Sequence, residues 1–310
     1  MGSQPHNHGR KILDEVRVMP EQSALLSIGV AGWSYPDWEG VVYSRGVKDH
    51  LRFIAGFVDM VEINRTFYRP PVAKECATWA KQVADLAEFF FSAKIHQEVT
   101  HEGKVDPAMA AAFREGLAPL VEAGRLRHLL AQFRYDFQDI PAARDHLSRI
   151  GDAFGGSGTL VLELRHRSWQ APVALEWLAG LNVTVANLDY PAGPASFDLP
   201  VCTVGRHAYF RLHGRNREAW YSKDAGRDET YNYLYGPEEL EGIRERMKRI
   251  RAASASLTVV TNNHYQGREL VNALQLKAKE KGGRVPVPPA LLARYPVLKE
   301  IAAPPPGELF

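Results

Sequence analysis

The sequence predicts a single (β/α)8 barrel of the TIM type, because eight strand-like segments alternate with helix-like segments over about 260 residues. The candidate strands lie at 27–33, 59–65, 88–96, 127–134, 159–166, 183–189, 207–213 and 257–263. The candidate helices lie near 47–57, 72–86, 108–124, 141–154, 172–180, 238–254 and 268–281. A doubly wound open sheet is the alternative architecture.

Helix-start signals support several of these elements. Pro141 and Pro172 stand where a first helical turn tolerates proline, and Pro237 is followed by acidic residues that favour a first turn. The domain organisation expected from this pattern is an N-terminal tail at 1–24, the barrel at 25–285 and a proline-rich tail at 286–310.

Composition narrows the classes of function. The chain has 310 residues, a net charge of +2 and two cysteines, Cys76 and Cys202. This charge balance gives no support by itself to nucleic-acid binding, and two cysteines are too few for a disulfide framework. The sequence shows no secretory signal and no apolar run long enough to cross a membrane. We therefore expect a cytoplasmic protein without a membrane partner.

Alternation along the strands predicts where a site lies. In 160–166, the leucines face one side, whereas Val161, Glu163 and Arg165 face the other. Other strands show similar rows, apolar early and polar late: Ser27, Gly29, Ala31 and Trp33; Glu62 and Asn64; Phe90, Ser92, Lys94 and His96; Leu130, Gln132 and Arg134; Val183, Val185, Asn187 and Asp189; Tyr209, Arg211 and His213. Barrel active sites lie at the carboxyl ends of the strands, so these rows predict a polar layer at that mouth.

The segments GWSYPDW, EINRTFYR, FSAKIHQEVTH, ELRHRSW, YFRLHGR and NNHYQGRELVNAL resemble the YecE-like family, also called domain of unknown function 72. The resemblance spans about residues 28–280 and implies a β/α barrel. It implies no established reaction. A likeness to endonuclease IV-type barrels is fold-level analogy and adds little about function.

The carboxylates in these rows have two interpretations. Glu62 and Glu163, with His213, are candidates for general acid/base catalysis, since two carboxylates in one mouth push their pKa values apart. Alternatively, the carboxylates neutralise basic residues in an ion-pair layer. Lys94, Arg165, Arg211 and Arg215 form a candidate clamp for phosphate or carboxylate. Further candidate ligand-binding residues are Trp33, Tyr35, Asn64, Tyr68, His96, Gln132, His166, Asn187, Asp189, Asn262, Asn263 and Gln266.

Three histidines raise the question of a cofactor. His96, His166 and His213, with Glu62, Glu163 or Asp189, have the donor atoms of a divalent metal site. No close ligand motif accompanies them. Hydrogen-bonded histidines are therefore favoured, and the cofactor stays unassigned.

These residues predict a protein that binds an anionic, phosphate-bearing small molecule or nucleic-acid fragment, as a hydrolase (of phosphodiester or related bonds) or a lyase. The alternative is a non-catalytic binding or adaptor protein in nucleic-acid maintenance. A separate feature is the terminal Leu309-Phe310 pair, which resembles the end of a sliding-clamp-binding peptide. The segment departs from that pattern at Pro306 and Gly307. The alternative to clamp binding is that the Leu309-Phe310 pair packs onto the barrel.

Overall fold

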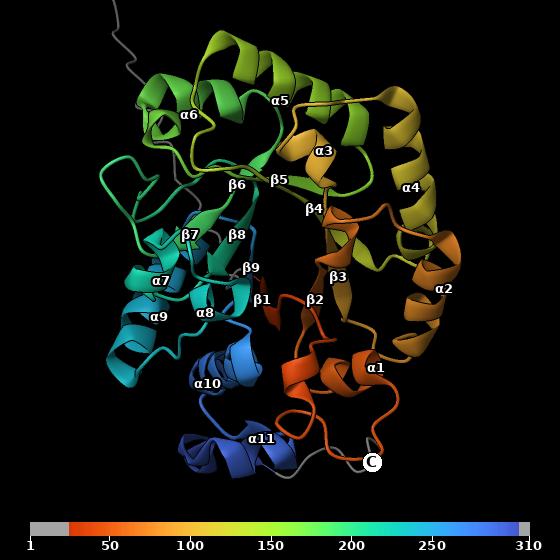
Figure 1. Ribbon diagram of the computed structural model, residues 1–310, viewed down its shortest axis with the longest axis vertical. Helices are drawn as coiled ribbons and strands as arrows, with labels where there is room; N and C mark the ends of the chain where they lie inside the picture. Colours follow the sequence, from red (N-terminus) through yellow and green to blue (C-terminus); the bar gives the residue numbers. More distant parts are fainter. Residues whose placement is uncertain (1–24, 304–310) are drawn as a thin grey trace, which may run out of the picture.

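Parallel strands form a nearly closed barrel in the computed structural model, which describes residues 25–303 without the side chain of Arg227 (Figure 1). The strands are β1 (Leu25–Val30), β2 (Met60–Ile63), β3 (Phe90–Lys94), β4 (Leu126–Gln132), β5 (Thr159–Glu163), β6 (Thr184–Val185), β7 (Asn187–Asp189), β8 (His207–Leu212) and β9 (Ser256–Thr261). They pair in the order β6-β5-β4-β3-β2-β1-β9-β8-β7. Because β6 and β7 are separated by Ala186 alone, the two ends of this order meet, which confirms the TIM-type barrel.

Helices surround the strands (Figure 1). They are α1 (His50–Ala55), α2 (Ala73–Gln82), α3 (Gln97–Thr100), α4 (Pro107–Glu122), α5 (Pro141–Phe154), α6 (Pro172–Ala179), α7 (Arg217–Tyr221), α8 (Arg227–Thr230), α9 (Pro237–Ala252), α10 (Arg268–Lys281) and α11 (Pro289–Arg294). Proline opens α5, α6 and α9 as the sequence predicts, since proline suits the first helical turn. The Asp106 carboxylate caps α4 by accepting a hydrogen bond from Met109 N at 2.7 Å.

The sixth strand differs from its predicted pattern. It is interrupted at Ala186, and the interior of the barrel receives Ala186 and Leu188. The predicted interior row of Val183, Val185 and Asn187 was wrong: both valines belong to the apolar layer between strands and helices. The period-2 pattern was read with the wrong parity, because the polar Asn187 and Asp189 lie on the outward face, where they bond to the Cys202 backbone and to Arg215.

The barrel interior is layered. Its apolar middle consists of Ala31, Met60, Phe90, Leu130, Val161, Ala186, Leu188, Tyr209 and Val260. The polar residues that stand near the end of each predicted row lie next to this layer, at the carboxyl ends of the strands. A larger apolar core fills the space between the strands and the helices.

Residues 285–303 are folded against the barrel. They form a short parallel pair, β10 (Val285–Pro286) with β11 (Ala302–Ala303), and α11 lies between them in the chain. Leu291 and Leu298 are fully buried. The prediction of a tail that begins at residue 286 was therefore wrong for residues 286–303, because apolar side chains of this segment pack against the rest of the fold. Residues 1–24 and the Leu309-Phe310 pair lie outside the described residues.

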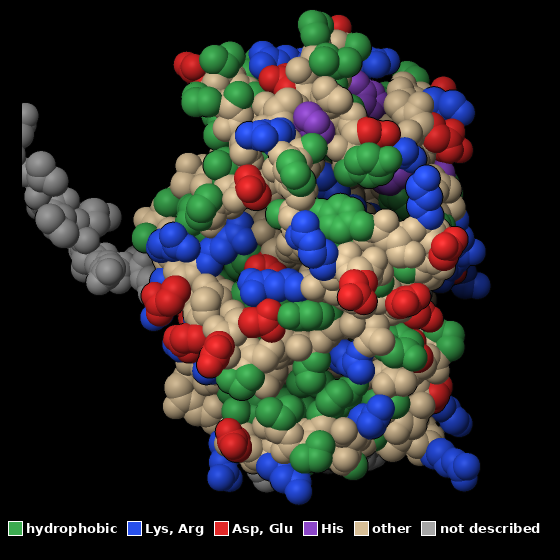
Figure 2. All heavy atoms as spheres, turned by 60° about the vertical axis from the view of Figure 1, so that its left-hand side comes forward, with side chains coloured by type: hydrophobic (Ala, Val, Ile, Leu, Met, Phe, Trp, Pro, Cys, Tyr) green, Lys and Arg blue, Asp and Glu red, His purple; other side chains and the backbone are tan. Residues whose placement is uncertain are grey.

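The surface carries charges of both signs. Figure 2 shows acidic and basic side chains interspersed over one face of the molecule. On α9, Arg244 pairs with Glu241 and Glu280, whereas Arg246 donates to the backbone carbonyl of Leu188 at 2.7 Å. Among the described helices, none is both long enough and apolar enough to cross a membrane.

Candidate functional site

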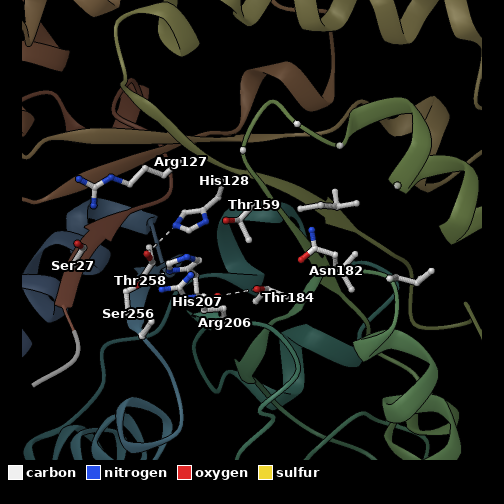
Figure 3. A pocket seen from close by; sticks show the side chains of 18 of the residues that line it. Ser27, Arg127, His128, Thr159, Asn182, Thr184, Arg206, His207, Ser256 and Thr258 are labelled. Atoms are coloured by element: carbon white, nitrogen blue, oxygen red, sulfur yellow. Dashed lines mark hydrogen bonds between the residues drawn. The ribbon is translucent and has the colours of Figure 1, made fainter. Parts of the chain in front are cut away.

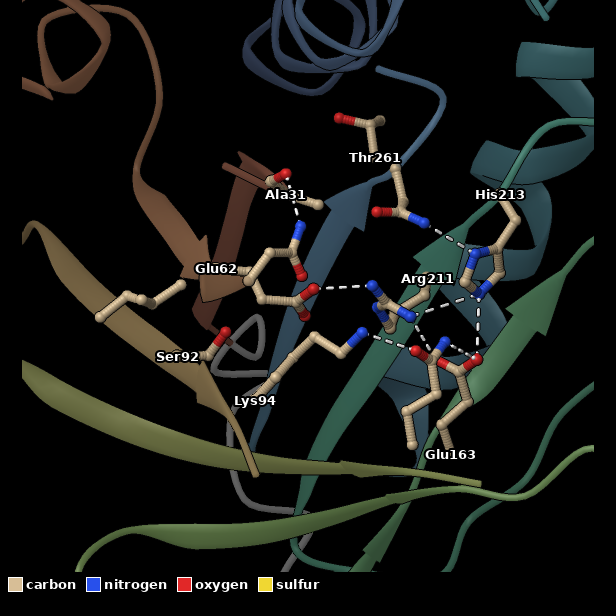
Figure 4. Close-up of polar contacts among 12 residues, drawn as sticks. Ala31, Glu62, Ser92, Lys94, Glu163, Arg211, His213 and Thr261 are labelled. Carbon is tan, nitrogen blue, oxygen red and sulfur yellow. Dashed lines mark hydrogen bonds and ion pairs between the residues drawn. The ribbon is translucent and has the colours of Figure 1, made fainter. Parts of the chain in front are cut away.

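A buried ion-pair network occupies the carboxyl-end mouth of the barrel, centred on Arg211 of β8 (Figure 4). Arg211 Nη2 donates to Glu62 Oε1 at 2.6 Å, and Arg211 Nη1 donates to Glu163 Oε2. Glu62 comes from β2 and Glu163 from β5, so a single guanidinium joins three strands. All three side chains are at most 1% exposed. These carboxylates are therefore partners in ion pairs, as in the second of the two interpretations of the sequence.

The remaining oxygens of both carboxylates are also occupied. Tyr209 donates its hydroxyl hydrogen to Glu62 Oε2 at 2.8 Å. Glu163 Oε1 accepts from Gln132 Nε2 at 2.6 Å and from Arg165 Nη2 at 2.7 Å. Burial pushes the pKa of Glu163 upward, but Arg211, His213 and Arg165 outweigh burial and hold that pKa well below its usual value. Glu163 is thus an ionised acceptor rather than a proton donor.

Lys94 of β3 is the basic residue of the mouth that has no carboxylate partner in the described part of the chain. Among the described residues its Nζ donates to the neutral amide oxygen of Gln132 at 2.7 Å, and it lies 4.3 Å from the centre of the Phe67 ring. Burial, followed by the neighbouring charge of Arg211, lowers the pKa of Lys94 to about 7. Two carboxylates balance two guanidinium groups in this network, so a protonated Lys94 leaves one positive charge in excess.

His213 completes the network. Its Nε2 lies 3.3 Å from Glu163 Oε1, and its Nδ1 is hydrogen-bonded with Asn262 Nδ2 at 3.0 Å. The side chain is fully buried, and burial lowers the pKa of His213 to about 4 although Glu163 opposes this effect. The imidazole is therefore neutral near pH 7.

An aromatic insertion covers one side of the mouth. It follows β8, contains α7 and α8, and brings Trp220 and Tyr231 over His213, with ring centres 5.8 Å and 6.3 Å away. The guanidinium of Arg165 lies 5.4 Å from the centre of the Trp220 ring. These contacts place the insertion against the site rather than on a remote surface.

A second ion pair lies beside the central network. Arg215 binds Asp189 through two nitrogens, at 2.9 Å and 2.7 Å, and Tyr235 donates to the same carboxylate at 2.8 Å. The side chain of Arg215 is 39% exposed, whereas that of Asp189 is 9% exposed. The predicted Arg215 thus anchors the start of the insertion to the end of β7.

Other predicted residues bond to the backbone. His96 and His166 accept hydrogen bonds from the N–H groups of Glu98 and Ser168 at 3.3 Å and 3.2 Å, as caps of short helices. Asn187, predicted to bind ligand, instead faces away from the barrel interior. Its side chain donates to the carbonyl of Cys202 and accepts from its N–H, at 3.1 Å and 2.8 Å.

Polar groups of the loop before α10 are hydrogen-bonded to other residues of the protein. Asn263 donates to Asn272 Oδ1 at 2.8 Å, and the N–H of Gln266 donates to an Asp37 carboxylate oxygen at 2.5 Å. Gln266 has a positive φ of 52°. Of the predicted residues here, Asn262 alone contacts the central network, through His213.

The predicted aromatic residues divide into packed and exposed rings. Trp33 packs edge-on against Trp79, with ring centres 5.3 Å apart. Tyr35 stacks on His264 at 4.6 Å and donates to the carbonyl of Ala31. Tyr68 is 57% exposed. Asn64 donates to the same carbonyl of Ala31 at 2.8 Å.

The donors suggested for a metal do not converge. Within residues 25–303, no group of three or more His, Cys, Asp or Glu side chains is placed to hold a metal ion. Arg211 separates Glu62 from Glu163, and His96 and His166 serve as helix caps. The geometry thus favours hydrogen-bonded histidines.

Glu269 is a buried acid that the strand rows did not reveal. It comes from the first turn of α10, accepts from Ala31 N at 3.3 Å and is fully buried. Burial raises the pKa of Glu269 well above its usual value, and Glu62 adds to this effect. An acid in a first helical turn is so common that its position gave no signal.

The fold and the mouth define a parallel β/α barrel with a buried network of ionisable side chains at its carboxyl end. Residues 27–291 match the family described as "Protein of unknown function DUF72". The chain belongs to this family, which confirms the YecE-like resemblance.

Relatives support this assignment. The chain is 24% identical over 272 residues to the UPF0759 protein YunF of Bacillus subtilis (strain 168), covering 81% of this chain and 93% of that protein. The crystal structure of a DUF72 family protein (TM1631) from Thermotoga maritima has a TM-score of 0.72 and 29% identity, covering 83% of this chain and 99% of the other. A second DUF72 structure (EF0366), from Enterococcus faecalis, has a TM-score of 0.71 and 24% identity over 82% and 94% of the two chains.

Proposed function

We propose that the protein is an enzyme that binds a small anionic molecule, bearing phosphate or carboxylate, at the carboxyl-end mouth of the barrel. The observation that carries this proposal is Lys94, a buried amine whose hydrogen-bond acceptor among the described residues is the neutral Gln132. Because Glu62 and Glu163 are already neutralised, an anionic ligand would supply the countercharge that protonated Lys94 lacks. Arg165, with 18% of its side chain exposed, would receive the ligand from the solvent side.

The reaction class that fits these groups best is that of a lyase. A lysine with a pKa near 7 exchanges its proton readily at neutral pH, and buried lysines of this kind act as bases or nucleophiles. Neutral Lys94 would take a proton from the carbon next to the ligand's carbonyl or carboxylate, and Arg211 and Arg165 would stabilise the charge that develops. The electron pair left on that carbon would form a carbon–carbon double bond and expel a phosphate group from the neighbouring carbon as inorganic phosphate. Glu62 and Glu163 would hold these guanidinium groups in place, and neutral His213 would fix the orientation of Glu163. Hydrolysis of a phosphate ester is the other catalytic outcome.

A non-catalytic binding or adaptor role in nucleic-acid maintenance is the second candidate. It is favoured by the observation that all four carboxylate oxygens of Glu62 and Glu163 already accept hydrogen bonds within the protein. Such a network could bind a ligand without turning it over.

The test combines binding with turnover. Thermal melting with phosphate is compared with chloride at matched ionic strength, because a ligand that binds the native state raises the melting temperature. Arg165→Gln should reduce the phosphate-dependent shift. Arg244→Gln, which removes an ion-paired arginine of similar burial on α9, should leave the shift unchanged.

Turnover is then measured by NMR over a panel of phosphorylated and carboxylated carbonyl compounds, with Lys94→Met alongside. Turnover lost in Lys94→Met supports the lyase. Turnover confined to phosphate esters indicates a hydrolase, and binding without turnover indicates the adaptor. An equal phosphate shift in Arg165→Gln and the parent would overturn the mouth as the anion site.

A further inference from the structure

A cavity with polar and apolar walls opens at the end of the barrel opposite the ion-pair network, and Figure 3 shows residues that line it. Its volume is about 1150 Å³. Its walls come from the amino-terminal ends of the strands, with Ser27 from β1, Thr159 from β5 and Thr184 from β6. The last turn of α5 and the Gly155–Gly158 segment complete the rim. The space is thus built into the barrel itself and is as large as pockets that hold metabolites.

The floor of this cavity is polar, although it continues the interior of the barrel. His128 of β4 is 4% exposed and hydrogen-bonded with Thr258 of β9 at 3.0 Å through Nε2. Its other ring nitrogen, Nδ1, is buried and has no hydrogen-bond partner among residues 25–303. Next to it, His207 is hydrogen-bonded with Ser256 at 2.9 Å. A buried imidazole nitrogen without a partner is uncommon and is satisfied when a ligand or water supplies the missing group.

The apolar middle of the barrel separates this cavity from the mouth. Phe90 and Tyr209 of that layer face His128 edge-on, with ring centres 5.8 Å and 5.2 Å away. Tyr209 directs its hydroxyl the other way, to Glu62. The cavity is therefore a separate compartment and not an extension of the ion-pair network.

The charge at the rim has a positive balance. Arg127 and Arg206 line the cavity, and among the residues that the structure describes Asp152 is the single carboxylate that does so. The guanidinium of Arg127 lies 4.1 Å from the centre of the Phe90 ring. Its ion pair with Glu88 is long, at 3.7 Å, and Glu88 is 94% exposed. Within residues 25–303, Arg206 has no ion-pair or side-chain hydrogen-bond partner.

We propose that this cavity is a second binding site, for a phosphate ester that also carries hydroxyl groups. Arg127 and Arg206 would bind the phosphate, because guanidinium groups match its oxygens. The hydroxyls of Ser27 and Thr159, which make no hydrogen bond within residues 25–303, would bind the hydroxyl groups of the ligand beside the His128 ring. This site does not depend on the function proposed for the mouth.

The experiment follows the imidazole signals of the full-length protein by ¹⁵N NMR during titration with glycerol 3-phosphate. Glycerol and inorganic phosphate are titrated separately, because each lacks one half of the recognised chemistry. The signals are assigned with His128→Gln, His207→Gln and His213→Gln. Saturable shifts of His128 and His207 are expected with glycerol 3-phosphate, whereas binding at the mouth moves the signal of His213.

Arginine variants then test the recognition. Arg127→Gln/Arg206→Gln should weaken binding at the His128 site at least about tenfold, since charged hydrogen bonds to the ligand are lost. Arg165→Gln at the mouth and Arg45→Gln, an exposed arginine away from the cavity, should change it less than about twofold. Unmoved His128 and His207 signals would overturn the proposal, as would equal affinity in the double variant and the parent. The His128 titration of the parent decides the question even if the double variant fails to fold.

Discussion

Replacing Glu163 by glutamine should lower the stability of the barrel, because this carboxylate binds two guanidinium groups in a fully buried position. Removing one partner of a buried ion pair costs about 3–5 kcal/mol. Arg211 keeps Glu62 at 2.6 Å, and Arg165 is 18% exposed and gains water. We therefore expect a loss near the lower limit, about 3 kcal/mol. For a domain of this size, that loss lowers the melting temperature by about 6–12 °C.

The pH dependence of this loss has a defined sign. The pKa of Glu163 is held well below its usual value in the folded protein, so its contribution is complete above the unfolded-state pKa of about 4.3. The contribution is lost as the pH falls through the folded pKa. The difference in unfolding free energy between Glu163→Gln and the parent should thus be fully present at pH 8, where Lys94 is mostly neutral in the folded parent, and should shrink below about pH 4.

Urea denaturation at several pH values measures this difference, with equal m-values as the check on two-state unfolding. Glu245→Gln is the matched control, since Glu245 pairs with Lys248 at 2.5 Å but is 58% exposed. The control should change stability by less than about 0.5 kcal/mol. A Glu163→Gln protein as stable as the control at pH 7 would refute the assigned role of the network.

Two further predictions concern Lys94 and the end of the chain. The pKa of Lys94 falls from 10.5 to about 7 on folding, so the native state binds fewer protons between these values and parent stability rises across that range. Lys94→Met should therefore have a higher free energy of unfolding than the parent at pH 6. The expected gain is about 3–4 kcal/mol once the loss of the hydrogen bond to Gln132 is subtracted. Urea denaturation should show that this gain vanishes towards pH 10. A gain independent of pH would contradict the lowered pKa. A peptide of residues 303–310 should bind sliding clamp weakly in a fluorescence titration, and deleting Leu309 and Phe310 should leave the melting temperature unchanged; a lower melting temperature would indicate packing instead.

The sequence predicted the barrel and most of its mouth because alternation is informative where one face of a strand is polar. Glu62, Lys94, Glu163 and Arg211 stand late in their rows, and the structure brings them together in one network. The sequence left open whether the carboxylates act as acids or as ion-pair partners, since that depends on distances between strands remote in the chain.

Other features gave no usable sequence signal. The orientation of the sixth strand depends on the break at Ala186, where residues on both faces are apolar. Burial of Glu269 follows from the docking of α10 against β1 rather than from its own position in the helix. Leu291 and Leu298 stand in a segment that contains four prolines between 286 and 296 and no long periodic pattern, so their docking onto the barrel could not be separated from a tail by pattern alone.

The break in the sixth strand also affects how the barrel opens. At this seam, Val185 N donates to the carbonyl of Val204 at 3.0 Å, and the Asn187 amide pairs with the backbone of Cys202. A connecting segment thus supplies hydrogen bonds that a neighbouring strand supplies elsewhere around the barrel. Displacing residues 202–204 would expose these groups while the pairing of β1 with β2 and β9 stays intact. The seam is therefore where backbone amides of the barrel wall should exchange with solvent through local fluctuation, at a lower free energy than global unfolding.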